Sequence, residues 1–259
     1  MEGNAGLARI KNRMVSDLKF SIITPCYNSE KTIARTLECI CSQTYSDFEY
    51  IVIDGASKDR TVEIVESYRS RLGDRLTVVS EPDKGIYDAM NKGIARARGE
   101  LVGIVNSDDF YEPDCLQNVA ALHDPAAGDY QIIYGGMRHL DEKGAMRSET
   151  FFHHDFLRRQ MINHPASFVT KALYDRFGAY DTQYRSAADF DFFLKMQKEP
   201  AVKFVPTTKV LTNFSSGGMS SSYTGVKETI CIQHKYGIIS KKSYLANRVK
   251  IWVKKKLRV

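Results

Sequence analysis

Short apolar runs alternate with amphipathic stretches through the first 110 residues of the chain. Four of these runs lack a helical period and end in polar or turn residues, which is typical of strands buried on both faces. They span 20–24, 48–53, 76–79 and 101–105. Between them, apolar residues recur at the spacing of one helix face. We therefore expect three helices, one after Ser29 and one after Asp59, each of which can cap its helix, and one over 86–97.

This alternation predicts an α/β fold with a parallel, doubly wound sheet and right-handed crossovers. In such sheets ligands bind outside the carboxyl ends of the strands. The loops 24–28, 54–59, 81–88 and 106–109 should therefore converge on one crevice. The chain contains neither G-x-G-x-x-G after its first strand nor G-x-x-x-x-G-K-[ST], so the usual dinucleotide and P-loop interpretations have no support.

The pattern changes after residue 109. Short strands are predicted over 130–134, 136–140 and 145–150, the last two joined by a hairpin turn at 141–144. A helix with several aromatic residues should start at Asp189, and a strand should span 210–214. A Ser- and Gly-rich run follows this strand, and a last helix is expected over 235–259.

Composition is consistent with one large globular domain and an appendage. The 259 residues are 43% hydrophobic and 26% charged, enough to bury a full core. We expect a flexible tail over 1–18, a main domain over 19–220 and a helical extension over 221–259. No run approaches the roughly 18 to 20 apolar residues of a membrane span, and the N-terminus lacks the apolar centre of a secretory signal. The five cysteines show no paired metal spacing. We therefore expect a cytoplasmic protein with reduced thiols.

The formal charge of +6 is concentrated in the tail. Residues 229–259 hold nine Lys or Arg and no acid, whereas the rest of the chain holds 28 basic and 31 acidic residues. In a helix over 235–259, Leu245, Val249, Trp252 and Val253 lie near one side, with basic residues on the others. This pattern is typical of a helix that binds an anionic membrane surface. A solvated helix and an oligomer contact remain the alternatives.

Polar residues at the predicted strand ends suggest the chemistry. The strand 101–105 is followed by Asn106, Ser107 and the adjacent acids Asp108 and Asp109. Two carboxylates at the end of a buried strand favour a divalent cation, because carboxylate oxygens are the ligands that Mg²⁺ and Mn²⁺ prefer. A strand-end turn or a helix cap is the structural alternative, and it suits Asp109 better than Asp108.

An ordered set of motifs resembles the inverting GT-A glycosyltransferases of family 2, which make bacterial polysaccharides. The resemblance covers about 20–220, and as an ordered set it is highly specific. The matching segments are TPCYN at 24–28, IDGASKD at 53–59, DKGIYDAMNKG at 83–93, NSDD at 106–109 with Pro113 behind, HPASF at 164–168, AADFD at 187–191 and GGMS at 217–220.

The resemblance implies a GT-A fold, in which a Rossmann-like, mainly parallel sheet has helices on both faces. A nucleotide-sugar-binding half over 19–112 would precede a mixed acceptor and catalytic half over 113–220. The implied reaction moves a hexosyl or N-acetylhexosaminyl group from a nucleotide diphosphate sugar, with a UDP-sugar favoured, to a hydroxyl of a carbohydrate or lipid-linked acceptor. Cell-surface polysaccharide or glycolipid assembly is the implied role.

The same resemblance assigns donor-binding residues. Thr24, Pro25 and Tyr27 would form the pocket floor, and Asp54 would accept a hydrogen bond from the base. Lys84 or the helix N-terminus would face the diphosphate, Asn106 would bond a ribose hydroxyl, and His164 would lie near the donor sugar. The other donor-binding residues are Asn28, Asp83, Asp88 and Ser107. Three of these residues have plain structural alternatives. Asp54-Gly55 is common turn chemistry, Lys84 can be a solvated surface amine, and His164 can be a packed histidine.

For the cation, Mn²⁺ or Mg²⁺, the resemblance assigns Asp108 as the ligand, with Asp109 less favoured. The family's D-x-D pattern usually begins two residues before its ligand, and here that position is Asn106. An amide can hydrogen-bond a ribose hydroxyl but ligates a cation poorly, so this departure weakens the implied metal site.

The catalytic base implied by the resemblance is Asp189. In an inverting transfer one carboxylate takes the proton of the acceptor hydroxyl while that oxygen displaces the nucleotide. Asp191 would instead orient a neighbour, and a helix N-cap is the structural alternative for Asp189. The loop 217–220 would close over the donor and exclude water, or it is a plain linker.

Two other classes of protein are alternatives to a glycosyltransferase. A sugar-nucleotide-binding or nucleotidyltransferase-like protein would share the sheet, but a pyrophosphorylase should have a Gly-rich loop after the first strand, where this chain has TPCYN. A nucleic-acid binder could use the basic tail, but the acidic crevice would repel phosphates. We therefore expect no nucleic acid partner, and an oligomer is left open.

Overall fold

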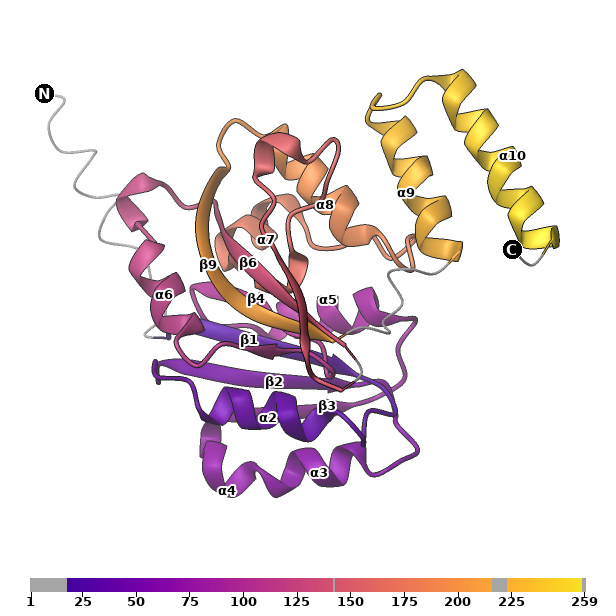
Figure 1. Cartoon of the computed structure of the whole chain (residues 1–259). Coiled ribbons are helices and arrows are strands. Elements are labelled where there is room, and N and C mark those ends of the chain that lie inside the picture. The colour runs from indigo at the N-terminus through magenta and orange to yellow at the C-terminus, as the bar shows by residue number, and fades with distance from the viewer. Residues whose placement is uncertain (1–17, 142, 216–222, 258–259) are drawn as a thin grey trace, which may run out of the picture.

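One mostly parallel sheet with helices on both faces forms the body of the protein, as the computed structural model shows (Figure 1). The structure describes residues 18–141, 143–215 and 223–257, with side chains described up to residue 251. The sheet has the strand order β3-β2-β1-β4-β8-β6-β9-β5, and β7 pairs with β6. The predictions for 1–17, and for a closing loop at 217–220, lie outside the described residues.

The first half confirms the predicted alternation of strands and helices. Strands β1, β2, β3 and β4 are parallel to one another, and the order reverses between β1 and β4. This reversal is the switch point at which ligands bind in such sheets. The elements are β1 (Phe20–Cys26), α2 (Ile33–Cys41), β2 (Phe48–Asp54), α3 (Thr61–Ser67), α4 (Arg69–Leu72), the 3₁₀ turn η1 (Gly73–Arg75), β3 (Leu76–Ser80), α5 (Ile86–Arg96) and β4 (Leu101–Ile104).

The second half extends the sheet with mixed pairing. Strand β8 is antiparallel to β4 and β6, whereas β6 and β9 are parallel. The elements are β5 (Phe110–Tyr111), α6 (Cys115–Leu122), η2 (Pro125–Ala127), β6 (Gln131–Leu140), β7 (Met146–Thr150), η3 (His154–Phe156), η4 (His164–Ala166), β8 (Ser167–Thr170), α7 (Lys171–Phe177), α8 (Ala188–Gln197), β9 (Lys203–Ser215), α9 (Tyr223–Lys235) and α10 (Lys241–Leu257).

The two strands predicted over 130–134 and 136–140 are one strand, β6. Gly135 and Gly136 do not end it, because they lie against β9: a Cβ on Gly135 would come within 2.6 Å of the Leu211 side chain. The pairing register with β9 shifts at this point, and the strand continues. The predicted hairpin is confirmed, since β7 pairs antiparallel with β6.

The single helix predicted over 235–259 is also wrong. Helix α9 begins upstream, at Tyr223, and ends at Lys235, and α10 begins at Lys241, so the extension is a helix pair (Figure 1). Gly237 adopts a left-handed backbone with φ 66°, which interrupts the helix. The Ser240 hydroxyl then accepts the backbone N–H of Ser243 at the start of α10.

The core lies in two layers, one on each face of the sheet. Helices α5, α7 and α8 cover one face, where Met90, Ile94 and Phe193 pack against Ile23 and Val102. On the other face, Leu37 and Ile40 of α2 and Leu116 of α6 form one cluster with Phe20 and Ile22 of β1, and all five are fully buried. With both faces covered, the polar side chains of the central strands collect at the strand ends. None of the described helices is long and apolar enough to cross a membrane.

Candidate active site

Two adjoining pockets open at the carboxyl ends of β1 and β4. The larger has a volume of about 690 Å³ and the smaller about 300 Å³. Ile86, Asn106 and Asp108 line both, so the two pockets share one wall. The residues that follow β4 therefore stand between them, as expected for a switch-point site.

The larger pocket gathers many of the residues predicted to bind the donor. Its lining includes Pro25, Tyr27, Asn28, Asp83 and Ser107. Tyr27 is 60% exposed, so its ring is free to stack on a planar ligand. Asn28 has a left-handed backbone, φ 49°, and its side-chain oxygen accepts the N–H of Lys58 at 2.9 Å. The first two strand-end loops are thus tied together at the rim.

Thr24 and Asp54 lie beneath this pocket, not in its lining. Both are fully buried, and the Thr24 hydroxyl accepts a hydrogen bond from the Tyr50 hydroxyl. The Asp54 carboxylate accepts the backbone N–H of Ser57 at 3.0 Å, the hydroxyl of Ser57, and the hydroxyl of Ser80 at 2.6 Å. These donors give Asp54 a structural function in holding the loop, and its predicted contact with the base stays a prediction.

The polar residues around the start of α5 face two different hollows. The Asp83 carboxylate faces the larger pocket and accepts the N–H of Gly85 at 2.8 Å. Lys84 and Asp88 instead line a separate small hollow together with Arg185. The Asp88 carboxylate, in the first turn of α5, accepts the Lys84 backbone N–H at 3.0 Å, so it holds the residue before the N-cap Gly85. The structure thus brings Asp83, but neither Lys84 nor Asp88, into the larger pocket.

The adjacent acids after β4 have different surroundings. Asp109 is fully buried, and its carboxylate accepts bonds from the backbone N–H of Ser215 at 3.0 Å and the amide of Asn106 at 3.1 Å. Burial, with the neighbouring Asp108 carboxylate, raises the pKa of Asp109 to about 7. Asp108 lines both pockets, and no other described residue donates a hydrogen bond to its carboxylate. Asp109 is thus engaged in holding the loop, whereas Asp108 is available to a ligand.

A divalent cation fits this wall of the pockets. The side-chain oxygen of Asn106 is buried and has no hydrogen-bond partner. Burial raises the pKa of Asp108, and Arg35 only partly opposes this effect. A cation beside the Asp108 carboxylate would favour its ionised form, and the unpaired Asn106 oxygen would gain a partner. These two oxygens are hard donors of the kind that Mg²⁺ and Mn²⁺ accept.

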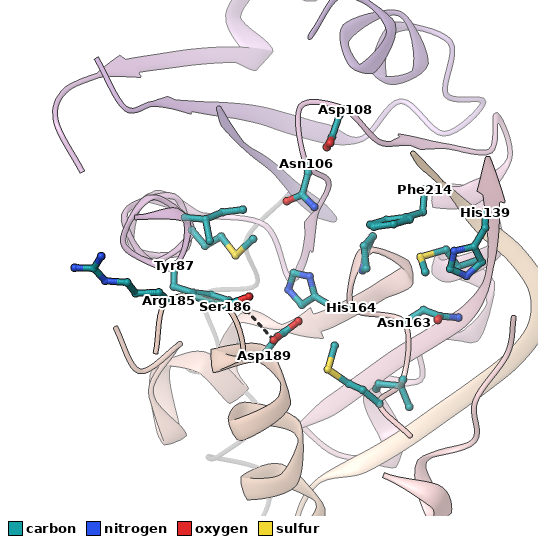
Figure 2. A pocket seen from close by; sticks show the side chains of 16 residues that line it. Tyr87, Asn106, Asp108, His139, Asn163, His164, Arg185, Ser186, Asp189 and Phe214 are labelled. Atoms are coloured by element: carbon teal, nitrogen blue, oxygen red, sulfur yellow. Dashed lines mark hydrogen bonds between the residues drawn. The ribbon is translucent and has the colours of Figure 1, made fainter. Parts of the chain in front are cut away.

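The smaller pocket holds Asp189, at the first turn of α8 (Figure 2). One carboxylate oxygen, Oδ1, accepts the Tyr87 hydroxyl at 2.8 Å and the backbone N–H of Phe190 at 2.9 Å. The other oxygen, Oδ2, has no hydrogen-bond partner in the described part of the chain. Asp189 is therefore fixed through one oxygen and open through the other, which is the arrangement that a general base needs.

His164 lies between Asp108 and Asp189 in the same pocket (Figure 2). Its Nε2 pairs with the Tyr180 hydroxyl at 2.9 Å, and that hydroxyl pairs with the one of Tyr174 at 3.0 Å. Burial lowers the pKa of His164 below its usual value, and the Asp189 carboxylate opposes this shift. The imidazole is thus neutral at pH 7, and among the described residues no partner binds its Nδ1.

Several residues of this pocket are not among those predicted from the sequence. Tyr87 lies inside the quoted segment 83–93, but its bond to Asp189 spans 102 positions of sequence and has no local signal. Arg185 also lines the pocket, with its side chain directed away from Asp189 (Figure 2). Apolar residues complete the wall, from elements far apart in the chain: Met90, Met137, Met161, Ile162 and Phe214.

The fold and the joined pockets are typical of an α/β enzyme whose binding site lies at the switch point of the sheet. The model of glycosyl transferase family 2 matches residues 21–187. A PGL/p-HBAD biosynthesis glycosyltransferase of Mycobacterium tuberculosis is 34% identical over 214 residues, which are 78% of this chain and 79% of that protein. Chondroitin synthase of Escherichia coli is 28% identical over 71% of this chain and 27% of its own length. The chain belongs to glycosyl transferase family 2 and is a glycosyltransferase.

Solved structures confirm the GT-A fold. Residues 1–349 of Staphylococcus aureus TarS, in complex with UDP-GlcNAc, superpose with a TM-score of 0.65 at 24% identity, over 83% of this chain and 66% of that chain. The mannosyltransferase PcManGT of Pyrobaculum calidifontis, in complex with GDP-Man and Mn²⁺, gives 0.64 at 20% identity, over 87% and 66%. The chain covers only 39% of a longer TarS structure.

The buried histidine predicts a pH dependence of stability. The pKa of His164 is lower in the native protein than in the unfolded chain, where it is about 6.5. As the pH falls below 6.5, His164 becomes protonated in the unfolded chain but stays neutral in the native protein. The unfolded state is therefore favoured, and the free energy of unfolding decreases. His164→Gln should lose less stability between pH 7.5 and 5.5, by no more than about 1.4 kcal/mol per pH unit for one proton. Urea unfolding at several pH values measures this difference, and parallel curves for the two proteins would contradict it.

Proposed function

We propose that this glycosyltransferase inverts the sugar it transfers, by a single displacement with Asp189 as the base and a divalent cation, Mn²⁺ or Mg²⁺, at Asp108. The donor is a nucleotide diphosphate sugar, with UDP favoured, and the acceptor is a hydroxyl of a carbohydrate or lipid-linked molecule in cell-surface polysaccharide or glycolipid assembly. The observation that carries this proposal is the free oxygen of Asp189, which opens into a pocket that shares its wall with the larger one.

The larger pocket suits the nucleotide and the smaller one suits the reacting groups. Tyr27 offers an exposed aromatic face for a base at the rim. The donor's diphosphate then lies at the shared wall, beside Asp108 and Asn106, and its sugar reaches into the smaller pocket toward His164 and Asp189. This placement puts the leaving group and the base on opposite sides of the sugar.

The reaction needs one proton transfer and one displacement. Asp189 Oδ2 takes the proton of the acceptor hydroxyl as the acceptor oxygen forms a bond to the anomeric carbon. The bond from that carbon to the nucleotide diphosphate breaks, and the electron pair leaves with the phosphate. The Tyr87 hydroxyl holds Oδ1 throughout, so that the basic oxygen keeps its direction. The anomeric configuration is inverted because the attack comes from the face opposite the leaving group.

Charge at the leaving phosphate must be neutralised at the shared wall. Asp108 would hold the cation, with the unpaired oxygen of Asn106 beside it, and the bound cation supplies Lewis acidity to the diphosphate. Asp109 positions this wall through its bonds to Asn106 and Ser215. His164, neutral at pH 7, can bond a sugar hydroxyl without bringing a competing positive charge to the site.

The lining of the smaller pocket favours an acceptor with an apolar surface. Three methionines, two isoleucines and a phenylalanine line this pocket, and methionine adapts to irregular apolar shapes. A relative named for PGL/p-HBAD biosynthesis, a glycosyltransferase of Mycobacterium bovis, covers 78% of this chain. These observations favour a lipid-linked or glycolipid acceptor over a free sugar.

The extension offers a surface for such an acceptor's membrane. Leu245 and Val249, one helical turn apart on α10, are 51% and 62% exposed. Exposed basic residues surround them: Lys241, Lys242, Arg248 and Lys250. The helix pair extends away from the sheet (Figure 1), so this face can reach an anionic bilayer. Trp252 and Val253 belong to the part of α10 whose side chains are not described.

The second candidate is a protein that binds a sugar nucleotide without transferring the sugar. A donor screen separates the two. The screen measures release of the nucleotide diphosphate in the presence of Mn²⁺, with and without alkyl glycoside acceptors. The donors are UDP-glucose, UDP-galactose, UDP-N-acetylglucosamine and GDP-mannose. Acceptor-dependent release supports the transferase, whereas binding without release supports the alternative.

Asp189→Asn should keep donor binding and lose transfer. The amide keeps the shape of the side chain and can still accept the Tyr87 hydroxyl, but it cannot take a proton. We expect kcat to fall ~10²- to 10⁴-fold, with nucleotide affinity unchanged by calorimetry. Asp175→Asn, on the exposed side of α7, is the matched control. Retained turnover in the Asp189→Asn variant would remove this residue from the mechanism.

Asp108→Asn tests the cation site. In the native protein Mn²⁺ should tighten UDP binding, and in the variant this gain should fall at least ~10-fold, because the only free carboxylate of the shared wall is lost. Calorimetry with UDP, with and without Mn²⁺, measures the effect. Asp74→Asn, at an exposed position of η1, is the control, and Mn²⁺ should tighten its UDP binding as much as in the native protein. An equal Mn²⁺ effect in all three proteins would disprove the assignment.

The membrane surface is tested with vesicles. The protein should bind phosphatidylglycerol vesicles and not phosphatidylcholine vesicles. Lys241→Ala and Lys242→Ala together should weaken binding about 30-fold, because each basic residue near the headgroups contributes about 1 kcal/mol. The control is Lys143→Ala together with Arg147→Ala, which removes the same charge from exposed positions of the β6–β7 hairpin. Unchanged vesicle binding after removal of residues 241–259 would show that the membrane role is wrong.

A further inference from the structure

The segment that leads into α8 is held by one carboxylate from the C-terminal extension. Glu228 lies on α9, and its Oε1 and Oε2 accept the backbone N–H of Arg185 at 2.9 and 3.1 Å. Oε2 also accepts the N–H of Ser186 at 2.8 Å and that of Ala187 at 3.2 Å. A single side chain thus binds three consecutive backbone amides.

These three amides come directly before the base. Ala187 is the N-cap of α8, and Asp189 follows two residues later. The N–H of Ala187 is one of the groups at the start of the helix that have no partner within it, and the N–H groups of Arg185 and Ser186 lie directly before the helix. A carboxylate is therefore a strong partner for them, because charge-assisted hydrogen bonds are about twice as strong as neutral ones.

A second contact joins the same two helices. The Lys235 ammonium group pairs with Asp191 at 2.7 Å, and the Tyr236 hydroxyl donates to the backbone oxygen of Asp191 at 3.2 Å. The Asp191 side chain is only 8% exposed, so its charge needs this partner. Glu228 and Lys235 are seven residues apart, which is two helical turns, and thus they lie on one face of α9. Helix α9 therefore holds α8 at two points, one on each side of Asp189.

The held segment belongs to the smaller pocket. Arg185 and Ser186 line it together with Asp189. On its other side Asp189 is fixed by Tyr87 of α5, which belongs to the nucleotide-binding half. The base therefore stands between two supports, and the support from Glu228 sets where the first turn of α8 begins. Displacing that turn would move Oδ2 relative to the sugar.

We propose that Glu228 is a positioning residue for the catalytic base, which makes α9 a structural part of the active site. Glu228 lies beyond residues 21–187, the segment that the family model matches. The extension thus contributes to the catalytic geometry of this chain in addition to the membrane role proposed for α10. This inference rests on the proposed function, because it assumes that Asp189 is the base.

Glu228→Ala should slow transfer without weakening donor binding. A misplacement of about 1 Å at a reacting group can cost ~10²-fold in rate. We therefore expect kcat to fall ~10- to 100-fold, with the KM for the donor found in the screen and the affinity for UDP with Mn²⁺ both changed less than ~3-fold. Glu228→Gln keeps one accepting oxygen and should recover part of kcat. Glu199→Ala, in the turn after α8, is the matched control and should behave as the native protein.

Hydrogen exchange tests the contact directly and needs no turnover. The amides of 185–187 should exchange slowly in the native protein and in Glu199→Ala, and faster in Glu228→Ala, while the protection of β1 and β4 stays unchanged. Unprotected amides in the native protein would disprove the contact. A native kcat in Glu228→Ala, or a kcat loss accompanied by an equal loss of UDP affinity, would disprove the positioning role. If the native protein releases no nucleotide diphosphate from any donor, the proposed function fails, and exchange still decides whether Glu228 holds the segment.

Discussion

Burial of both faces of the central sheet is the constraint on which the rest of this structure depends. Helices cover the sheet on each side, so most side chains along β1 and β4 are apolar and unsatisfied polar groups lie in the loops where these strands end. The strand order reverses between β1 and β4, which opens space at that edge. The four strand-end loops meet there because the strands are parallel, and both pockets follow from this arrangement.

The residue proposed as the catalytic base comes from outside this parallel unit. Asp189 lies in the first turn of α8, after the antiparallel strand β8, and it reaches the pocket because α8 packs on the same face of the sheet as α5. The Tyr87 hydroxyl joins the two halves at the base. Helix α9 supports the same residue from the other side through Glu228 and Lys235. Three segments of the chain thus determine the position of one carboxylate.

The acids of the site show how burial assigns different roles to similar side chains. The carboxylates of Asp54 and Asp109 accept hydrogen bonds from nearby hydroxyl, amide or backbone donors, and these bonds hold loops in place. Asp108 and Asp189 each keep an oxygen that no described residue satisfies. Free oxygens in a pocket are available for a ligand or a proton, whereas satisfied ones stabilise the fold. The same residue type therefore holds the fold together beneath the pocket and is available to a ligand within it.

The sequence by itself determined the first four strands, the helices between them, the convergence of their loops and the preference of Asp109 over Asp108 for a structural position. These features are local, because apolar period and turn chemistry act over a few residues. Only the tertiary structure decided that β6 continues through Gly135 and Gly136, that Asp54 lies beneath the pocket, and that Tyr87 and Glu228 support Asp189. Those contacts join residues 26 to 102 positions apart, for example Ser80 to Asp54 and Tyr87 to Asp189. No local pattern encodes such pairs, because packing of whole elements brings them together.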